Sequence, residues 1–364
     1  MRLDEENHMA RTDLPALAAL GRRRFLLGGA AIGAGAVLAG CTGNEPESTS
    51  EGQAAAPAGD NAETGRAVTI GFSAPAADHG WMAAITDNAE SRAEQFEDVT
   101  LEATEGTNDP SAQIAAVETL LNGGIDALVI LPFDGNALTE IGRRATDQGI
   151  PVINLDRVFS TPLAYRTYIG GDNYGMGVAA GNFIGQQLRD AGVSNPIIGE
   201  IAGIDALPLT QDRSRGFREA LATFGFQVGP RQAAEFTVES GESVTANLLQ
   251  AAPRLDALWN HDDDQGIGVL AAIDNAGRDE FIMVGGAGSA NAMELIQSGD
   301  SVLKATVTYP PTMAGDAVSL ARLVAQGRGM SDLVEPSIPS SIVVASGTVT
   351  ADNVEEYLPL GFRS

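Results

Sequence analysis

The stretch NDPSAQIAAVETLLNGGIDALVIL, residues 108–131, contains a helix signal followed directly by a strand signal. An Asn-Asp-Pro sequence provides a cap and a proline at the first helical position, and a Gly-Gly pair at 123–124 ends the pattern. Between them the apolar residues Ile114, Val117, Leu120 and Leu121 recur at helical spacing. Residues 127–131 then read as a buried strand. Together with the strand expected before them, they predict a βαβ unit in a parallel sheet, with a right-handed crossover.

The same alternation continues along most of the chain. Short apolar runs are separated by longer amphipathic segments, which is the pattern of parallel sheets covered by helices. The further predicted strands are 67–73, 99–103, 151–155, 196–201, 257–259, 281–285 and 305–308, with another ending near 235–236. We therefore expect an α/β fold. The 324 residues that follow position 40 exceed the usual size of one hydrophobic core, which favours two lobes.

The N-terminal region has the features of an export signal. Arg22-Arg23-Arg24 precede an uncharged run from Phe25 to Ala39, and Leu38-Ala39-Gly40-Cys41 follows. The run is too short for a stable membrane span, and its basic flank suits an exported protein. The paired arginines resemble a twin-arginine signal, and the small residues before Cys41 resemble the cleavage site of bacterial lipoproteins. We predict a signal peptide over 1–40 and lipid attachment at Cys41; the alternative is a basic leader with a chance cysteine.

Composition narrows the possible partners. The formal net charge is −26, and it becomes −27 if residues 1–40, with five Arg and four Asp or Glu, are removed. A surface with this much negative charge repels nucleic acid and anionic lipid. We therefore expect contact with the membrane to be made through the lipid on Cys41. Cys41 is the only cysteine, which excludes an intrachain disulfide. Residues 41–66 are rich in Glu, Ser, Gly, Ala and Pro, and we interpret them as a flexible linker.

Polar and aromatic residues follow several predicted strands. In open parallel sheets, ligands bind beyond the carboxyl ends of the strands. The segments in question are Asp78-His79-Gly80-Trp81, Asp156-Arg157, the loop leading to Arg213, Glu235-Phe236 and Asn260-His261-Asp262-Asp263-Asp264. Carboxylates accept from hydroxyl groups, guanidinium groups donate in a planar fork, and aromatic faces cover C–H surfaces. This chemistry predicts a site for a sugar or sugar alcohol.

These segments give the chain a resemblance to the periplasmic sugar-binding proteins of ABC importers, of the ribose-binding type. The resemblance spans residues 67–345. It rests on Ile153-Asn154-Leu155-Asp156-Arg157, Ile169-Gly170-Gly171-Asp172-Asn173, Asp212-Arg213-Ser214-Arg215-Gly216-Phe217 and Asp262-Asp263-Asp264 before Gly266-Ile267-Gly268. It implies two doubly wound parallel-sheet lobes joined by three crossover strands, with a ligand cleft between them. The N-terminal lobe would contain 67–171 and 309–336, and the C-terminal lobe 172–308 and 337–364.

The resemblance also implies ligand contacts. Matched position by position, they are His79, Trp81, Asp156, Arg157, Arg213, Phe236, Asp262 and Tyr309. Asp262 stands where ribose binders commonly have Asn, and Tyr309 where they have Gln. In Gly285-Gly286-Ala287-Gly288, glycine and alanine occupy positions where the family often has an aromatic residue and Asp. Because one carboxylate acceptor is absent, the ligand is expected to be a small sugar or polyol that need not be ribose.

Each of these residues also has a structural explanation. Asp156-Arg157 could form a surface ion pair, Arg213 could lie on a solvated helix face, and His79 could cap the following helix. Trp81 and Phe236 could be core aromatics, as we expect Trp259 to be. The acidic triplet could stabilise a helix start, so only Asp262 is taken as a ligand contact.

Other functions are less well supported. His79 and His261 are the only histidines after residue 40, and without a recognisable ligand spacing they do not predict a metal site. The chain has no nucleophile elbow, no P-loop and no dinucleotide-binding motif after its first strand, which disfavours an enzyme and a bound cofactor. A ligand-binding partner of a membrane sensor stays open as the alternative to an importer. A DNA-binding repressor with similar lobes is disfavoured by the export signal.

Overall fold

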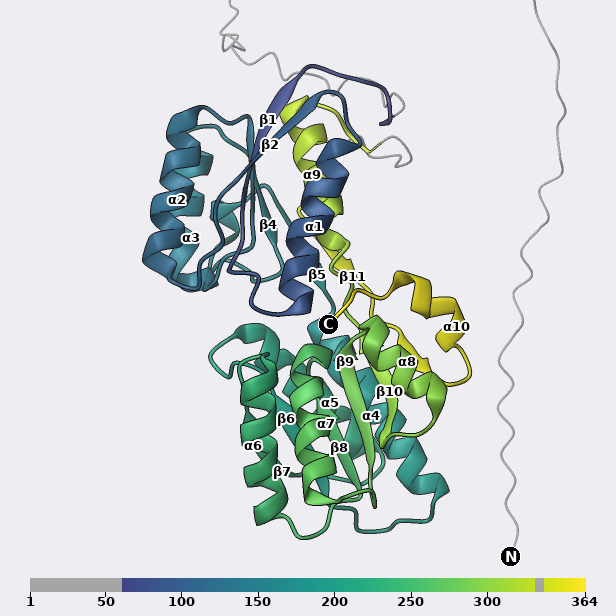
Figure 1. Cartoon of the computed structure of the whole chain (residues 1–364). Helices are drawn as coiled ribbons and strands as arrows, with labels where there is room; N and C mark the ends of the chain where they lie inside the picture. The colour runs from purple at the N-terminus through teal and green to yellow at the C-terminus, as the bar shows by residue number, and fades with distance from the viewer. Residues whose placement is uncertain (1–60, 331–336) are drawn as a thin grey trace, which may run out of the picture. The chain divides into compact units, whose positions relative to one another are not determined.

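The computed structural model describes residues 61–330 and 337–364 (Figure 1). The predicted signal peptide, Cys41 and most of the predicted linker lie outside these residues. No helix in the described ranges has both the length and the apolar character needed to cross a membrane.

The first lobe is built on a six-stranded sheet. Its strand order is β11-β5-β4-β3-β1-β2, and all neighbouring strands are parallel. Helices α1 and α9 pack together on one face, and α2 and α3 cover the other (Figure 1). The elements are β1 Val68–Ser73, α1 Gly80–Glu94, β2 Val99–Ala103, α2 Pro110–Gly123, β3 Ala127–Ile130, α3 Gly135–Asp147, β4 Val152–Leu155, the short 3-10 helix η1 Pro162–Ala164, β5 Thr167–Gly171, α9 Met313–Ala325 and β11 Ser341–Val344.

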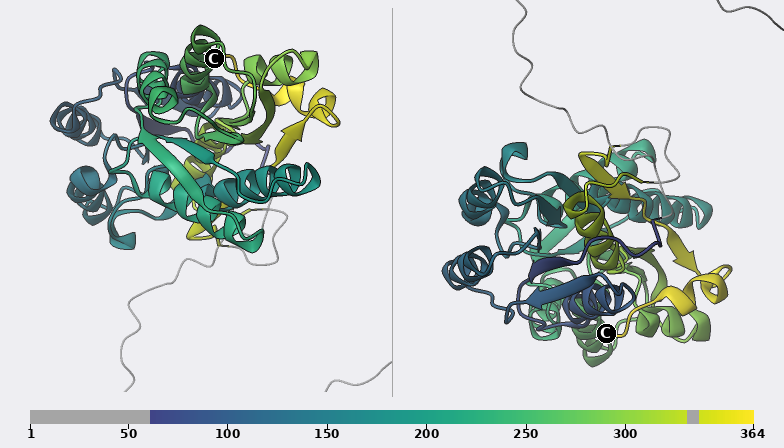
Figure 2. Two further views of the ribbon diagram at one scale, coloured as in Figure 1. Left: turned by 90° about the horizontal axis from the view of Figure 1, so that it is seen from below. Right: turned by 90° about the horizontal axis from the view of Figure 1, so that it is seen from above.

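The second lobe repeats this plan. Its strand order is β12-β10-β9-β8-β6-β7, and only the edge strand β12 is antiparallel to its neighbour. The elements are α4 Asn173–Asp190, β6 Ile198–Ala202, α5 Pro208–Thr223, β7 Val228–Ala233, α6 Val238–Ala251, β8 Ala257–Asn260, α7 Asp263–Ala276, β9 Ile282–Ala287, α8 Ala290–Ser298, β10 Leu303–Thr308, β12 Thr348–Thr350, α10 Val354–Tyr357 and the 3-10 helix η2 Leu358–Leu360. Figure 2 shows this last, yellow part of the chain beside α8.

The chain passes between the two sheets three times. It leaves the first sheet after β5, returns after β10 to form α9, and leaves again between β11 and β12. The predicted fold class, two parallel-sheet α/β lobes joined by three crossovers, is therefore confirmed.

One predicted assignment is wrong. Residues 337–364 were expected in the C-terminal lobe, but β11 pairs with β5 in the first sheet, from Ser341 opposite Tyr168 to Val344 opposite Gly171. The strand change occurs only at 345–347, before β12. The run SIVVASGTV is apolar on both sides of this point, so its local pattern does not indicate which sheet each half joins.

The segment that opened the sequence analysis folds as predicted. Helix α2 begins at Pro110, and the Asp109 carboxylate accepts hydrogen bonds from the backbone N–H groups of Ser111 and Ala112. The helix ends at Gly123, and the capping residue Gly124 has a φ of 84°, in the left-handed region that glycine adopts without strain. The following β3 pairs in parallel with β1, which completes the βαβ unit.

A buried ion pair attaches α9 to the first lobe. Arg322 donates from Nε and Nη2 to the two Asp98 oxygens at 2.7 Å each, and both residues are buried. The Arg322 guanidinium lowers the pKa of Asp98 far below its ordinary value. Because α9 follows most of the second lobe in the sequence, from α4 to β10, this bidentate contact holds the returning chain on the first lobe.

Candidate functional site

A small cavity lies where the carboxyl ends of the strands of the two lobes face each other. Its volume is about 30 Å³, and the residues that line it are His79, Trp81, Met82, Asp156, Arg157, Leu209, Arg213, Phe236, Asp262, Ala287 and Tyr309. All eight residues chosen from the sequence are among them. The structure thus brings these residues together, and their contact with a ligand stays a prediction.

Asp156 and Arg157 reach the cavity from the end of β4. Asp156 has a φ of 60°, a left-handed conformation held by Tyr168, whose hydroxyl donates to the Asp156 carbonyl at 2.9 Å. Arg157 is buried and donates from Nη1 to the Phe133 carbonyl at 2.7 Å. Its Nε is buried with no hydrogen-bond partner among the described residues. Burial lowers the pKa of Arg157, while the Asp156 carboxylate raises it. A buried, unpaired N–H beside a cavity is a natural donor to a ligand oxygen.

Arg213 enters from α5 in the second lobe. It donates from Nε to Asn173 Oδ1 at 2.8 Å and from Nη1 to the His261 carbonyl at 3.1 Å. Its guanidinium carbon lies 4.7 Å from the centre of the Tyr309 ring and 5.8 Å from that of Phe236. Arg213 is only 4% exposed, so the solvated helix face considered as its alternative role is excluded.

Two aromatic residues border the cavity from opposite lobes. Trp81, in the first turn of α1, donates from its indole N–H to the Tyr309 carbonyl at 2.8 Å. Phe236 lies between β7 and α6 with a φ of 64°, and its backbone N–H donates to Gln265 Oε1 at 3.0 Å. This contact from α7 maintains the strained backbone of Phe236, and the backbone conformation directs the ring toward the cavity.

The three consecutive aspartates have three different partners. Asp262 caps α7 through Oδ1, which accepts from the N–H groups of Asp264 and Gln265, and burial raises its pKa well above the ordinary value. Asp263 is buried and accepts from the backbone at Gly286, Gly288 and Ser289, and from the Thr306 hydroxyl. Asp264 crosses to the first lobe, where Oδ2 accepts from the Trp81 N–H at 2.8 Å. Of these three residues only Asp262 was predicted to be functional, and the contacts of Asp263 and Asp264 were not predicted from the sequence.

The two histidines have separate environments. His79 occupies the N-cap position of α1, as its alternative role predicted, but its side chain makes no capping hydrogen bond there; its Nδ1 lies 2.5 Å from Asp78 Oδ1 instead. His261 is fully buried beside Glu200, 3.0 Å from Nε2 to Oε1, and against the Trp259 ring; burial lowers its pKa. Over the described ranges, no group of three His, Cys, Asp or Glu residues is placed to hold a metal ion. Trp259 is fully buried, as predicted.

The glycine-rich carboxyl end of β9 forms one wall. A Cβ on Gly286 would lie 2.4 Å from the His261 carbonyl oxygen, so a larger residue there would displace the backbone. Ala287 lines the cavity with a φ of 84°. The carboxylate that the family resemblance placed at this position is replaced by a methyl group, and this wall offers the ligand no side-chain acceptor.

Two apolar lining residues, Met82 and Leu209, were missed from the sequence. Each is adjacent to a recognised feature: Met82 follows Trp81, and Leu209 follows Pro208 at the start of the helix that carries Arg213. Their proximity along the chain was the available signal. Because apolar residues at a helix start usually pack in a core, the sequence alone did not separate the two roles.

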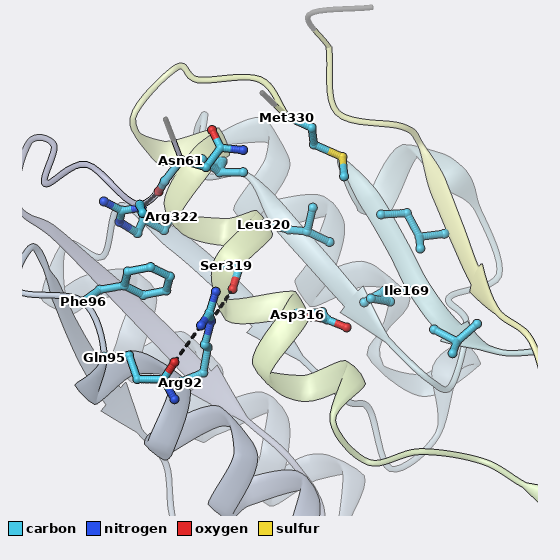
Figure 3. Close-up of a pocket in the computed structure, with 14 residues that line it drawn as sticks. Asn61, Arg92, Gln95, Phe96, Ile169, Asp316, Ser319, Leu320, Arg322 and Met330 are labelled. Carbon is cyan, nitrogen blue, oxygen red and sulfur yellow. Dashed lines mark hydrogen bonds between the residues drawn. The ribbon is translucent and has the colours of Figure 1, made fainter. Parts of the chain in front are cut away.

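A larger cavity lies on the flank of the first lobe. Its volume is about 590 Å³, and it is bordered by α1, α9, β5 and β11 (Figure 3). Arg92 donates there to Ser319 and Gln95. Its lining is mostly apolar. None of its lining residues lines the smaller cavity between the lobes.

Two α/β lobes with a polar and aromatic cavity between the ends of their strands define a two-lobed binding protein for small molecules. The chain belongs to the periplasmic binding protein domain family, whose model matches residues 70–329.

Individual relatives agree with this assignment. The ribose import binding protein of Bacillus subtilis is 30% identical over 247 residues, which are 68% of this chain and 78% of that protein. An ABC transporter solute binding protein from Mycobacterium smegmatis, solved with bound glycerol, is 26% identical with a TM-score of 0.73, covering 82% of this chain and 99% of that one. Another structure from Mycobacterium smegmatis, in complex with β-D-fucofuranose, is 25% identical with a TM-score of 0.73, covering 80% and 94%.

Proposed function

We propose that this protein captures a small sugar or sugar alcohol outside the cytoplasm and delivers it to the permease of an ABC importer. The observation that carries the proposal is the cavity in which Asp156, Arg157, Arg213 and Asp262 meet between aromatic rings. Charged donors and acceptors bond hydroxyl groups, and ring faces cover the C–H surface of a sugar. The Bacillus subtilis relative is named a ribose import binding protein, and the two structural relatives contain β-D-fucofuranose and glycerol.

The role we assign is binding rather than catalysis. The related proteins are named as binding proteins, and importer relatives favour delivery to a permease over docking on a membrane sensor. A sensor partner would use the same cavity, so the two roles differ only in the protein that recognises the closed form.

A thermal-shift screen tests the proposal. Purified residues 42–364, shown to be folded and freed of carried-over ligand, are heated with a panel of monosaccharides and sugar alcohols. A ligand that binds only the folded state raises the melting temperature, so we expect a selective shift with one or a few of them. The absence of a shift with every sugar and polyol would contradict the proposal and favour an unrelated ligand or a catalytic role.

The export signal and lipid anchor complete the proposed function. Cys41 would carry the lipid, and residues 42–66 would separate the folded lobes from the membrane. In the native host, the wild-type protein is expected in the membrane fraction and a Cys41→Ser variant in the soluble exported fraction. Equal membrane association of the two proteins, measured by fractionation and immunoblotting, would contradict lipid attachment at this residue.

Ligand capture is proposed to occur by closure of the lobes, which a bound ligand stabilises because it contacts both. Asp264 of the second lobe accepts from the first turn of α1, where no side chain of the first lobe provides a cap. The end of the chain also reaches this place, because Arg363 O and Ser364 Cα would lie 2.4 and 2.7 Å from a Cβ on Gly80. These contacts belong to the closed arrangement and would be lost on opening.

Gly80→Ala is therefore expected to weaken ligand binding about tenfold, because overpacking a close contact typically costs about 1–3 kcal/mol. The stability of the ligand-free protein should not fall, since alanine is the better helix former. Isothermal titration calorimetry measures the first effect and thermal unfolding the second. Gly123→Ala is the control, because the nearest atom to its Cβ would be 3.8 Å away. Unchanged affinity in Gly80→Ala would show that this contact does not form in the ligand-bound state.

A further inference from the structure

The cavity between the lobes is small, and the Tyr309 side chain forms part of its wall. Tyr309, the first residue after β10, lies between Trp81, whose ring centre is 5.7 Å from its own, and the Arg213 guanidinium, 4.7 Å from the ring centre. Tyr309 is 2% exposed and forms part of the cavity lining. The remaining space is about 30 Å³, far less than the cavity of about 590 Å³ on the flank of the first lobe.

The Tyr309 hydroxyl forms hydrogen bonds with polar groups of the protein that would otherwise be free to bond a ligand. It donates to Asp156 Oδ1 at 2.5 Å and accepts from Asn173 Nδ2 at 3.1 Å and from the Gly171 N–H at 3.3 Å. Burial, and then the neighbouring Asp156 carboxylate, raise the pKa of Tyr309, so the hydroxyl stays protonated and remains a donor. One oxygen of Asp156 is therefore bonded within the protein before any ligand arrives.

Tyr309 is also held firmly in place. Its backbone N–H donates to the Ala287 carbonyl at 2.9 Å, and its carbonyl accepts from the Trp81 indole at 2.8 Å. The ring lies so close to the backbone of the crossover that a Cβ on Gly171 would be 2.1 Å from Tyr309 Cε2. A ligand cannot displace the ring without moving the crossover between the lobes.

The small volume belongs to the closed arrangement. Asp264 and Trp81, from different lobes, are hydrogen bonded at 2.8 Å while the cavity has this size. The lobes are already in contact at this bond, so they cannot close further around a ligand. A ligand too large for the cavity would have to hold the lobes apart and break the bond.

We propose that Tyr309 limits the ligand of this site to a polyol of three or four carbons, such as glycerol or a tetritol. This inference rests on the proposed function and specifies its ligand class. Arg157 Nε, Arg213 and Asp262 supply bonds to two or three hydroxyl groups of such a chain. The tyrosine ring occupies the space that a pentose or hexose ring would need, and its hydroxyl takes the acceptor that a further ligand hydroxyl would use.

Calorimetric titration of residues 42–364 with glycerol, erythritol, threitol, xylitol, ribose and glucose tests the inference. We expect at least tenfold tighter binding of glycerol or a tetritol than of any five- or six-carbon compound. Tyr309→Gln, which removes the ring and keeps a polar end, should improve five-carbon relative to four-carbon binding by at least tenfold. Tyr309→Phe keeps the ring and should keep the size limit, although it leaves Asp156 Oδ1 without its donor.

The possible results distinguish failure of the size limit from failure of the proposed function. Tighter binding of ribose, xylitol or glucose by the wild-type protein would overturn the size limit while leaving the proposed function intact. Binding of none of the six compounds would overturn the inference, and it would overturn the proposed function as well if the thermal-shift screen also showed no shift with any sugar or sugar alcohol. An unchanged size preference in folded Tyr309→Gln would remove Tyr309 as its cause. If that variant does not fold, Leu209→Ala enlarges the same cavity from the second lobe, and the wild-type preference by itself still decides the ligand class.

Discussion

Asp263→Ala is expected to lower the free energy of unfolding by about 3–5 kcal/mol, the largest stability effect we predict for a single residue near the site. Asp263 accepts from the N–H groups of Gly286, Gly288 and Ser289 at 2.8–2.9 Å and from the Thr306 hydroxyl at 2.8 Å. Truncation leaves these buried donors unpaired. Each donor that water cannot reach then lowers the free energy of unfolding by about 1–3 kcal/mol. Urea unfolding followed by circular dichroism measures the change.

Two further variants test whether the loss of stability comes from the Asp263 carboxylate. Thr306→Val removes one of the four donors and should cost about 1 kcal/mol. Asp274→Ala, at an exposed position of the same helix, should leave stability within about 0.5 kcal/mol of the wild type. Because the bonded turn includes Ala287, Asp263→Ala should also lose ligand affinity. Wild-type stability in Asp263→Ala would show that these donors do not depend on the carboxylate.

Arg213→Ala is expected to weaken ligand binding about ten- to hundredfold or more. A lost hydrogen bond to a charged group costs about 1.5–3 kcal/mol, and each 1.4 kcal/mol is a factor of ten in affinity. The side chain also supports the site, since it bonds Asn173 and the His261 carbonyl and packs against Tyr309. Titration with the ligand identified in the thermal-shift screen measures the loss.

A matched arginine lies two residues further along α5. Arg215 is exposed, pairs with Asp212 at 2.6 Å on the helix surface, and does not line the cavity. Arg215→Ala should therefore bind ligand with wild-type affinity. Arg213→Lys should recover part of the loss, because it restores the charge without the planar fork. If Arg213→Ala and Arg215→Ala bind equally well, Arg213 is not a ligand contact.

The candidate site was largely predictable because its residues follow a rule of chain topology. Side chains just beyond the carboxyl ends of parallel strands converge, so Asp156 and Asp262 could be expected at one place once their strands were recognised. The family resemblance then selected Trp81, Arg213, Phe236 and Tyr309. The different roles of Asp262, Asp263 and Asp264 could not be predicted in this way. Adjacent side chains at the start of a helix point in different directions, and the partner that each one meets depends on how the two lobes pack.

The fold class, most of the strands and the set of residues at the strand ends could be predicted from the sequence alone, whereas β5, β11 and β12 were not among the predicted strands. The predicted features follow from local properties: apolar periodicity, helix caps such as Asp109, and turn residues such as Gly124 act over a few positions. Only the tertiary structure decided that Asp264 bonds the opposite lobe, that Tyr309 engages Asp156, and that β11 joins the first sheet. Each of these contacts joins residues more than 150 positions apart. Their partners are chosen by how the two lobes and the crossovers pack, and no local pattern records that packing.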